Sequence, residues 1–523
     1  MTEKNAMEST PVVRKRIKLV PPDGGWGWMV VLGTALSNIF NQSMLSLFSL
    51  LYGDAIESMG HNTKGASIVL STMLFVANFG GPLAGVIVKL TSPRFVAVTG
   101  ACFCTSGILI SGFSTNIWHL IISYGIILGT GLGFIQNSSF VAINSYFKLK
   151  KSRAVGLGNV GTGVGQTLMP HLVRYLLEHY GFRGACLILA GLSLHGIGGT
   201  LLIQPVERHM KKVEEEVVVD ENLRLLEVNQ IVISNNDKDP KLNRDVKYVR
   251  SLTEPNLISH NGNEKSVDIV SEKKHSSQKE LNVSKSYKSE NGVNGSNIAV
   301  PVIKKGLLKK MYDLFDISLL SSPRFLNVIF GTAIVTTSVQ NFSMLFPLFL
   351  QKAADMDKNE TAMCMSAVAF ADITGRLLLP YLQDKYRIKA RWMLSVFVTW
   401  ILIVRQILAY QTNFVVIMII SCLYGFGRSM IIVCRNLSIS AQCNLKQVPA
   451  AVGLGMLTMG LVVPPLGYFL GWIRDYTDSY IVCITTQNAI LALFLVMWIP
   501  DLVHQWVQEK RQNRKDVEQI HLK

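Results

Sequence analysis

The strongest constraint on how this chain folds is a series of apolar runs, each long enough to cross a lipid bilayer as one helix. A spanning α-helix needs roughly 20 predominantly apolar residues. Such runs lie at roughly residues 28–52, 66–88, 95–113, 118–143, 154–178, 184–203, 325–350, 361–383, 392–410, 414–440, 450–472 and 479–500. We therefore predict an all-α membrane protein with twelve transmembrane helices in two six-helix halves.

The amount and placement of charge also favour a membrane protein. Charged residues make up 16% of the 523 residues, whereas soluble domains carry about 25%. The net charge of +16 would suit nucleic-acid binding, but the lysines and arginines gather in segments beside the apolar runs. Cytoplasmic loops of membrane proteins collect Lys and Arg in this way. We therefore exclude nucleic acid as a partner.

Basic clusters beside the spans predict the orientation of the chain. They comprise Lys148, Lys150, Lys151 and Arg153; Lys385, Arg387, Lys389 and Arg391; and Lys510, Arg511, Arg514 and Lys515. An even number of spans puts these clusters and the basic N-terminal tail on the same side of the lipid bilayer, which the charge bias marks as cytoplasmic. We expect a multi-pass protein of the plasma membrane with both termini in the cytoplasm.

The spans divide the chain into five segments. We predict a cytoplasmic N-terminal tail at 1–27, a six-helix bundle at 28–203, a disordered cytoplasmic loop at 204–324, a second six-helix bundle at 325–500 and a cytoplasmic C-terminal tail at 501–523. The central loop is polar and poor in aromatic residues, a composition that does not bury a core. Six spans, a polar loop and six spans resemble the layout of the major facilitator superfamily, whose halves rock about a midplane site.

Motifs outside the spans add few constraints. The loop sequence around Thr253 resembles a phosphorylation-dependent adaptor motif, with a chance match as the alternative, and Asn359 begins a glycosylation sequon in a predicted outside loop. The eight cysteines form no CxxC pair and have no histidine at zinc-finger spacing, so we predict neither a metal site nor a disulfide framework. We also predict no cofactor and no enzymatic activity, because the sequence has no GxSxG, HExxH or P-loop motif.

The most informative residues are charges inside the apolar spans. Asp372 and Arg376 lie four residues apart in the eighth span, so both side chains project from one helix face. Each charge costs about 3 kcal/mol at the helix centre on insertion scales, and a mutual salt bridge would offset part of this. The fork of Arg376 suits a substrate carboxylate, which Asp372 would modulate by releasing Arg376 when protonated or by competing for it. The alternative is a pair that only fixes helix packing.

Other polar residues in the spans leave two interpretations open. They are Arg405 in the ninth span, Arg428 and Arg435 in the tenth, Asn38, Asn41 and Gln42 in the first, and Gln136, Asn137 and Asn144 in the fourth. Arg428 and Arg435 share a helix face, and Arg435 is close enough to the cytoplasmic end to snorkel. The amides suit either substrate contacts or interhelical hydrogen bonds. We include Arg435, Asn41 and Gln42 among the candidate substrate-binding residues.

Two short motifs make the chain recognisable. The first is the entry to the first span, an acidic residue followed by two glycines and two interfacial tryptophans. Its residues are Asp23, Gly24, Gly25, Trp26, Gly27 and Trp28. The second enters the fifth span, with Tyr146, Phe147 and Lys148, a basic cluster through Arg153, and then glycines at 156, 158, 161, 163 and 165, beginning with Gly156. In order and spacing, the two motifs resemble the signatures of the monocarboxylate transporter family.

This resemblance implies transport of monocarboxylates such as lactate, pyruvate or ketone bodies, often with a proton. It also implies that Asp372 and Arg376 match the family's Asp/Arg pair in the eighth span, and that a single-span glycoprotein chaperone is a partner of some members. Proton-coupled members carry a lysine in the first span, at the position of Ser46 in this sequence. Members without it include carriers of thyroid hormone, aromatic amino acids, creatine and carnitine.

Three functions therefore remain open. The first is a monocarboxylate transporter that works by alternating access, with symport of protons. The second is a proton-independent carrier of a larger or zwitterionic carboxylate, favoured by the absent lysine. In either carrier, Arg376 would hold the substrate, and Ser46 would help to shape the pocket. The third is a membrane sensor or scaffold without transport, in which the charges inside the spans would be structural only.

Overall fold

The computed structural model of the protein describes residues 12–60, 63–219 and 312–521, and its chain divides into two compact units. The smaller unit comprises Met1–Lys18 and Glu214–Lys304. Its described residues belong to the strands β1 (Val12–Val20) and β2 (Lys211–Val219), which pair in a two-stranded sheet. These strands lie in segments predicted as a tail and a disordered loop, so the described ends of those segments have regular structure.

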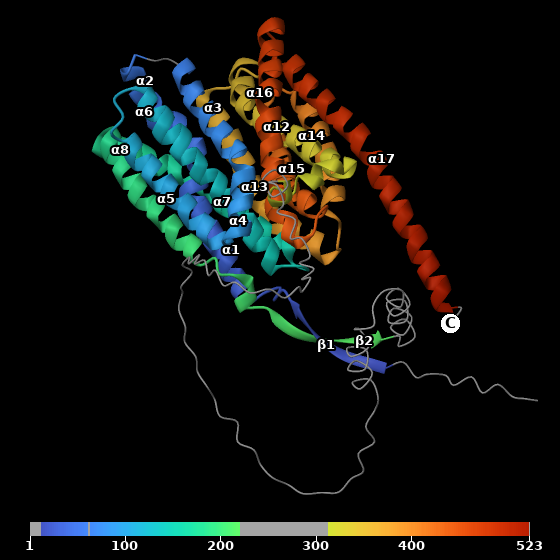
Figure 1. Ribbon diagram of the computed structural model, residues 1–523. Helices are drawn as coiled ribbons and strands as arrows, with labels where there is room; N and C mark the ends of the chain where they lie inside the picture. The colour runs from blue at the N-terminus through green and yellow to red at the C-terminus, as the bar shows by residue number, and fades with distance from the viewer. Residues whose placement is uncertain (1–11, 61–62, 220–311, 522–523) are drawn as a thin grey trace, which may run out of the picture. The chain divides into compact units, whose positions relative to one another are not determined.

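The larger unit is helical, and Figure 1 shows its helices packed side by side. Its N-terminal half, called the N-half below, contains α1 (Trp26–Ser37), η1 (Asn38–Gln42), α2 (Met44–Ser58), α3 (Thr63–Phe79), α4 (Gly81–Leu90), α5 (Pro93–Ser111), α6 (Ile117–Leu120), η2 (Ile121–Leu128), α7 (Gly129–Tyr146), α8 (Lys151–Leu201) and η3 (Val206–Arg208). Its C-terminal half, the C-half, contains η4 (Ile317–Ser321), α12 (Pro323–Lys352), α13 (Lys358–Lys385), α14 (Ala390–Leu408), α15 (Phe414–Ser440), η5 (Leu445–Gln447), α16 (Val448–Thr477) and α17 (Tyr480–His521).

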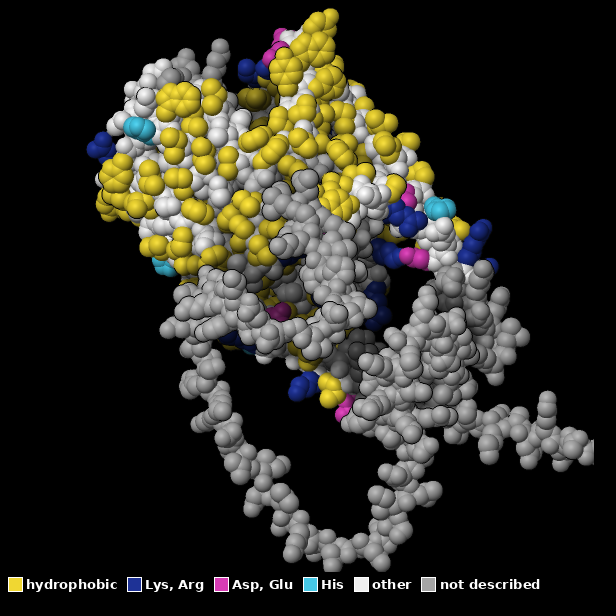
Figure 2. Space-filling model, viewed as in Figure 1, with side chains coloured by type: hydrophobic (Ala, Val, Ile, Leu, Met, Phe, Trp, Pro, Cys, Tyr) yellow, Lys and Arg dark blue, Asp and Glu magenta, His cyan; other side chains and the backbone are white. Residues whose placement is uncertain are grey.

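Within the part of the chain that the structure describes, ten helices are long and apolar enough to cross a membrane. The helix α8 alone joins two of the predicted spans across a kink at Gly181, whose φ is 65°. The first predicted span follows α1, the π-helical η1 and α2, and the turn at Ser43 divides it. Figure 2 shows apolar side chains over much of the visible face of the helical unit, as expected of a surface in contact with lipid.

The starts of two helices follow directly from local sequence. Both α5 and α12 begin with the sequence Ser-Pro-Arg-Phe, at 92–95 and 322–325. In each case the serine hydroxyl accepts a hydrogen bond from the phenylalanine backbone N–H, and proline occupies the first helical position. A proline there lacks only an N–H that the helix would leave unpaired.

Glycines allow the helices of the N-half to pack backbone to backbone. A side chain at Gly161 would collide with the carbonyl of Ala35, and one at Gly33 with the carbonyl of Gly199. Both contacts join α1 to α8. Small residues at such interfaces let membrane helices approach closely, which strengthens van der Waals packing where the hydrophobic effect is absent.

The two halves contact each other near the end of the bundle that carries the loops 147–150 and 386–389, called the basic end below. There the backbones of α4 and α16 are in direct contact. A Cβ on Gly453 would lie only 2.5 Å from the carbonyl oxygen of Gly81. The buried amide of Asn137 on α7 donates to the carbonyls of Gly81 at 3.3 Å and Pro449 at 3.2 Å, so one side chain of the N-half ties α4 to α16. The described structure is therefore closed at the basic end.

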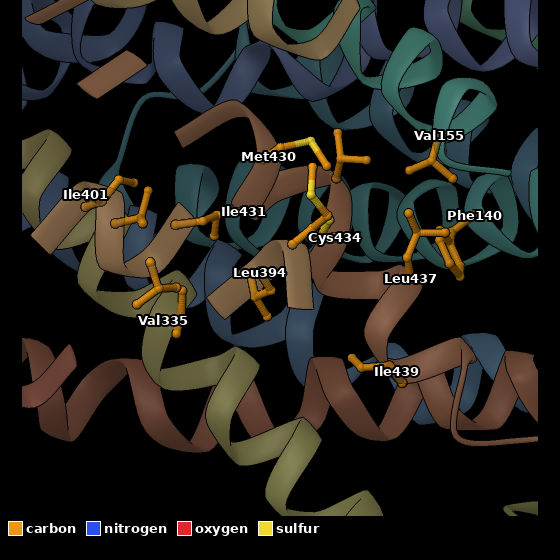
Figure 3. Packing of buried hydrophobic residues seen from close by; sticks show 14 of the residues in the cluster. Phe140, Val155, Val335, Leu394, Ile401, Met430, Ile431, Cys434, Leu437 and Ile439 are labelled. Atoms are coloured by element: carbon orange, nitrogen blue, oxygen red, sulfur yellow. The ribbon is translucent and has the colours of Figure 1, made fainter. Parts of the chain in front are cut away.

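Apolar side chains complete this closure. Figure 3 shows Phe140 of α7 and Val155 of α8 beside Leu437 of α15, with Cys434 one turn away on the same helix. All four are buried and belong to a single apolar cluster that crosses from one half to the other. Burial of this kind excludes water from the basic end of the interface.

The close approach of α4 to α16 predicts a penalty for any added side chain. In Gly85→Ala the new methyl would collide with the backbone of Pro449, so we expect the apparent unfolding midpoint of the detergent-solubilised protein to fall by several degrees. Overpacking of a tight interface typically costs about 1–3 kcal/mol.

The matched control is Gly191→Ala, because a Cβ on Gly191 meets no atom within 4 Å. It should leave the midpoint unchanged or raise it, since alanine favours helix more than glycine does. Equal stability of the two variants would show that α4 and α16 are not in backbone contact.

Candidate anion site

An ion pair lies buried in α13, where the C-half meets the N-half. The Nη2 of Arg376 lies 2.5 Å from Oδ2 of Asp372, and the two residues are 2% and 3% exposed. The Nη1 of Arg376 donates a hydrogen bond of 2.6 Å to the backbone carbonyl of Asn159 on α8. The sequence prediction that Asp372 and Arg376 share one helix face and pair is therefore confirmed, and the arginine also reaches across to the other half.

Glycines on α8 make room for this contact. A Cβ on Gly156 would lie 2.7 Å from the carbonyl oxygen of Arg376, and one on Gly163 would lie 2.7 Å from Cγ1 of Ile373. Gly156 and Gly163 are two turns apart and face α13. Gly161 and Gly165 face α1 and η1 instead, and Gly158 lies between Ile143 of α7 and Thr34 of α1. The glycine-rich stretch thus serves two helix interfaces at once.

The pair keeps unused hydrogen-bonding capacity. Oδ1 of Asp372 and Nε of Arg376 are buried, and neither has a partner among the residues that the structure describes. Buried polar atoms without partners are uncommon in proteins and mark sites of strain, function or ligand binding. An acceptor and a donor therefore remain available beside an already formed ion pair.

Arg405 on α14 is fully enclosed and held by neighbours from two other helices. Its guanidinium donates to the hydroxyl and carbonyl oxygens of Ser338 at 3.0 and 3.3 Å, and to the hydroxyl of Tyr424 at 3.2 Å. It also lies over the ring of Phe342, 4.2 Å from the centroid. Cation–π contacts of this kind stabilise a desolvated arginine. Arg405 is therefore a packing element that joins α12, α14 and α15.

Arg428 and Arg435 on α15 lack carboxylate partners in the described part of the chain. Arg428 makes no hydrogen bond or ion pair there, and its Nε is buried. The Nε of Arg435 donates to the amide oxygen of Asn436 at 3.3 Å, and its Nη1 lies 3.4 Å from the sulfur of Met459 on α16. A thioether is a weak acceptor, so both arginines retain most of their capacity to bind an anion.

The polar residues of the first span form a π-helical turn, η1, from Asn38 to Gln42. The amide of Asn38 donates to the carbonyl of Gly158 at 2.8 Å, and the amide of Gln42 donates to that of Leu132 at 3.2 Å. Fully buried Asn41 accepts a hydrogen bond of 2.6 Å from the hydroxyl of Ser193. These contacts are interhelical, and a role of Asn41 and Gln42 in substrate binding stays a prediction.

Some candidate residues fall outside what the structure describes. Ser46 lies in α2, but the structure does not describe its side chain. Thr253 lies outside the described residues. Asn359 lies exposed in the first turn of α13.

The two sequence signatures contact each other. Asp23 Oδ1 accepts hydrogen bonds from the backbone N–H groups of Lys148 at 2.6 Å, Leu149 at 2.8 Å and Lys150 at 3.4 Å. The N–H of Asp23 in turn donates to the carbonyl of Tyr146 at 3.1 Å. The acidic residue of the first signature thus closes the turn that opens the second, and fixes where α8 begins.

The aromatic and glycine positions of the signatures reinforce this turn. A Cβ on Gly27 would lie 2.9 Å from the ring of Phe147, and Trp28 packs on the same ring with centroids 4.9 Å apart. The indole N–H of Trp26 donates to the carbonyl of Leu202 at 3.2 Å, and the hydroxyl of Tyr146 donates to that of Gln204 at 3.1 Å. Gly24 and Gly25 precede α1, and Gly25 has a φ of 57° that favours glycine.

Asp384 is a residue that the sequence analysis missed. Its carboxylate, at the end of α13, accepts hydrogen bonds from the backbone N–H groups of Ser152 at 3.1 Å and Arg153 at 2.9 Å, at the start of α8. Arg153 also lies over the ring of Tyr381, 4.2 Å from the centroid. A negative charge is unfavourable at the C-terminal end of a helix. The position of Asp384 in the sequence therefore indicated that its partners lie on another helix.

An ion pair between the halves lies near the same end of the bundle as the Asp384 contacts. Lys89, in the last turn of α4, pairs with Asp316 just before η4 and donates to the carbonyl of Leu314 at 3.3 Å. With Asp384 it holds the basic end closed by polar contacts at the rim of the apolar cluster. Neither the Lys89–Asp316 pair nor the contacts of Asp384 involve a residue of the candidate anion site.

The model of the Major Facilitator Superfamily matches residues 31–464 and 328–518 of the chain. Similar proteins include monocarboxylate transporter 13 of Rattus norvegicus, 31% identical over 36% of this chain and 44% of that protein. Monocarboxylate transporter 1 of the same organism is 29% identical over 48% of this chain and 51% of that protein, so the chain spans about half the length of these relatives. The crystal structure of the human organic anion transporter MFSD10 (TETRAN) has a similar fold, with a TM-score of 0.56 and 12% identity over 92% of this chain and all of that one.

The geometry of the buried pair predicts a non-additive effect on stability. Asp372→Ala leaves an uncompensated arginine inside the bundle, and removing one partner of a buried pair costs about 3–5 kcal/mol. We expect a marked drop in the unfolding midpoint of the purified protein in detergent.

The double variant Asp372→Ala/Arg376→Met removes both charges and keeps most of the volume of the arginine side chain. It should recover much of the lost stability, as replacement of a buried ion pair by apolar residues is often neutral. Additive losses in the double variant would contradict a mutually dependent pair.

Proposed function

The chain belongs to the major facilitator superfamily, and we propose that it is a carrier of the monocarboxylate transporter type that moves carboxylate anions across the membrane by alternating access. The observation that carries this proposal is the buried Asp372–Arg376 pair, whose arginine is bonded to the opposite half through the carbonyl of Asn159. A charge kept inside a membrane bundle at the contact between two mobile halves is the arrangement expected of a transport site.

The contact with Asn159 links substrate binding to the conformation of the protein. When the halves separate at the basic end, Nη1 of Arg376 loses its acceptor on α8. A substrate carboxylate then takes that acceptor's place, while Asp372 competes for the same guanidinium. Because the arginine has different partners in the two conformations, the substrate has a different affinity for each, as any ligand-driven switch requires.

Arg435 supplements this site from α15. Its Nη2 forms no hydrogen bond with the described residues, and its Nη1 reaches the sulfur of Met459 on α16. In our proposal Arg435 attracts the anion on its way to Arg376. The π-helical turn that holds Asn41 and Gln42, and Ser46 beyond it, forms the wall contributed by the N-half.

The first span also bears on the coupling ion. Proton-coupled relatives carry a lysine in this span, whereas this chain has none between residues 26 and 58. We propose that the carboxylate passes without an obligatory proton, since arginines already balance its charge. Symport with a proton is the alternative, and the dependence of uptake on pH separates the two.

The remaining proposals concern the surroundings of the carrier. The basic loops would face the cytoplasm of a plasma-membrane protein, with both termini on that side. A single-span glycoprotein chaperone as partner stays a prediction.

Loss of Arg376 should abolish transport. In cells that express the protein, Arg376→Ala should lower uptake of radiolabelled pyruvate at least tenfold at equal surface abundance, because the paired hydrogen bonds to the carboxylate disappear. Arg376→Lys should not restore uptake, since an ammonium lacks the planar fork. The control is Arg324→Gln at the exposed start of α12, which should transport normally. Uptake that persists in Arg376→Ala would refute this role.

External pH should have little effect on uptake. Pyruvate and lactate stay ionised between about pH 7.5 and about pH 6, because a carboxylic acid of this kind titrates near pH 4. A proton-independent carrier should therefore change its initial rate less than about twofold over this range. A several-fold acceleration at the lower pH, abolished by a protonophore, would establish symport instead.

A further inference from the structure

The charges inside the C-half are strongly unbalanced. Within residues 361–383, 392–410 and 414–440, the parts of α13, α14 and α15 predicted to cross the membrane, the charged side chains include four arginines, at 376, 405, 428 and 435, and the single carboxylate of Asp372. The salt bridge to Asp372 neutralises Arg376, and hydroxyl groups and aromatic rings enclose Arg405. Two arginines, both on α15, remain without such compensation.

Arg428 is the more informative of the two. It lies in the middle of α15, twelve residues before Ser440, so its Cα is about 18 Å from the nearer helix end at 1.5 Å per residue. An arginine side chain does not reach that far, which excludes snorkelling to the membrane surface. The charge of Arg428 must therefore be balanced inside the bundle.

The guanidinium of Arg428 is free to meet a ligand. Its Nε is buried without a partner, whereas its two terminal nitrogens are neither hydrogen-bonded nor buried in the part of the chain that the structure describes. A Cβ on Gly375 of α13 would lie 2.2 Å from Oγ of Ser429 on α15, so the turn that carries Arg428 packs against the turn that carries Arg376. Arg428 therefore lies at the same depth of the bundle as the Asp372–Arg376 pair.

We propose that Arg428 binds a second acid group of the substrate, so that this carrier accepts organic dianions such as dicarboxylates. One carboxylate of the ligand engages Arg376 as described above. The other engages Arg428, with Arg435 two turns further along the same face of α15. This inference rests on the proposed carboxylate transport and extends it to the substrate class. A dianion supplies a second carboxylate for Arg428 and Arg435, which a monocarboxylate bound to Arg376 does not.

The test compares a dicarboxylate and a monocarboxylate of equal carbon count. Uptake of radiolabelled glutarate and valerate is measured in cells that express the full chain, and each rate is corrected for surface abundance. We expect glutarate to be taken up with an apparent affinity about tenfold tighter than valerate, because a charge-assisted hydrogen-bonded pair contributes at least this much.

Variants of Arg428 assign the preference to this residue. Arg428→Gln should lower the preference in apparent affinity for glutarate over valerate about tenfold. Arg428→Lys should retain part of this preference because it keeps the charge. Arg428→Gln removes an unpaired charge from the membrane interior, so membrane insertion should not suffer. The matched control Arg324→Gln, at an exposed arginine, should keep the preference of the unaltered protein.

The outcomes separate this proposal from the one on which it rests. If valerate enters but glutarate neither enters nor competes, the dianion proposal is overturned and carboxylate transport stands. The dianion proposal is also overturned if valerate uptake requires chloride and glutarate does not compete, since an inorganic anion then balances Arg428. If neither acid enters at normal surface abundance, carboxylate transport itself fails.

Discussion

The close approach of α8 to α13 is the interaction on which the candidate site depends. Gly156 and Gly163 bring the two backbones near enough for Arg376 to donate to the carbonyl of Asn159. A larger residue at either glycine would push α13 away and leave the guanidinium without that acceptor. The same geometry makes the site conditional, because a bond that crosses from one half to the other survives only while the halves are closed at the basic end.

The closure itself combines two kinds of contact with different consequences. Glycines of α4 and α16, with the bridging amide of Asn137, give a short-range fit that is lost at once when the halves separate. The contacts of Lys89 and Asp384 are polar and directional, and they lie close to the loops that end α13 and precede α8 and η4. The proposed alternating access requires that these contacts break and reform, with two packings that differ by only a few kcal/mol.

Much of the fold follows from the sequence, because hydrocarbon thickness fixes how long a spanning helix must be. The pairing of Asp372 with Arg376 was equally predictable, since their spacing alone puts them on one face. The pattern left Arg405 and Arg428 indistinguishable, as each is an arginine far inside an apolar span without a carboxylate at helical spacing. Only the neighbours on α12 and α15 separate an enclosed packing arginine from an open one, and contacts between distant helices leave no local trace in the sequence.

The signatures show how a motif can be recognisable without its purpose being visible. Asp23 could have been a simple helix cap for α1, yet its carboxylate closes the turn before α8. That turn sets the start of the helix whose glycines face both α1 and α13. We therefore expect the first signature to affect the candidate anion site at a distance. By fixing the start of α8, Asp23 helps to position the carbonyl of Asn159 that Arg376 contacts, although Asp23 touches neither residue.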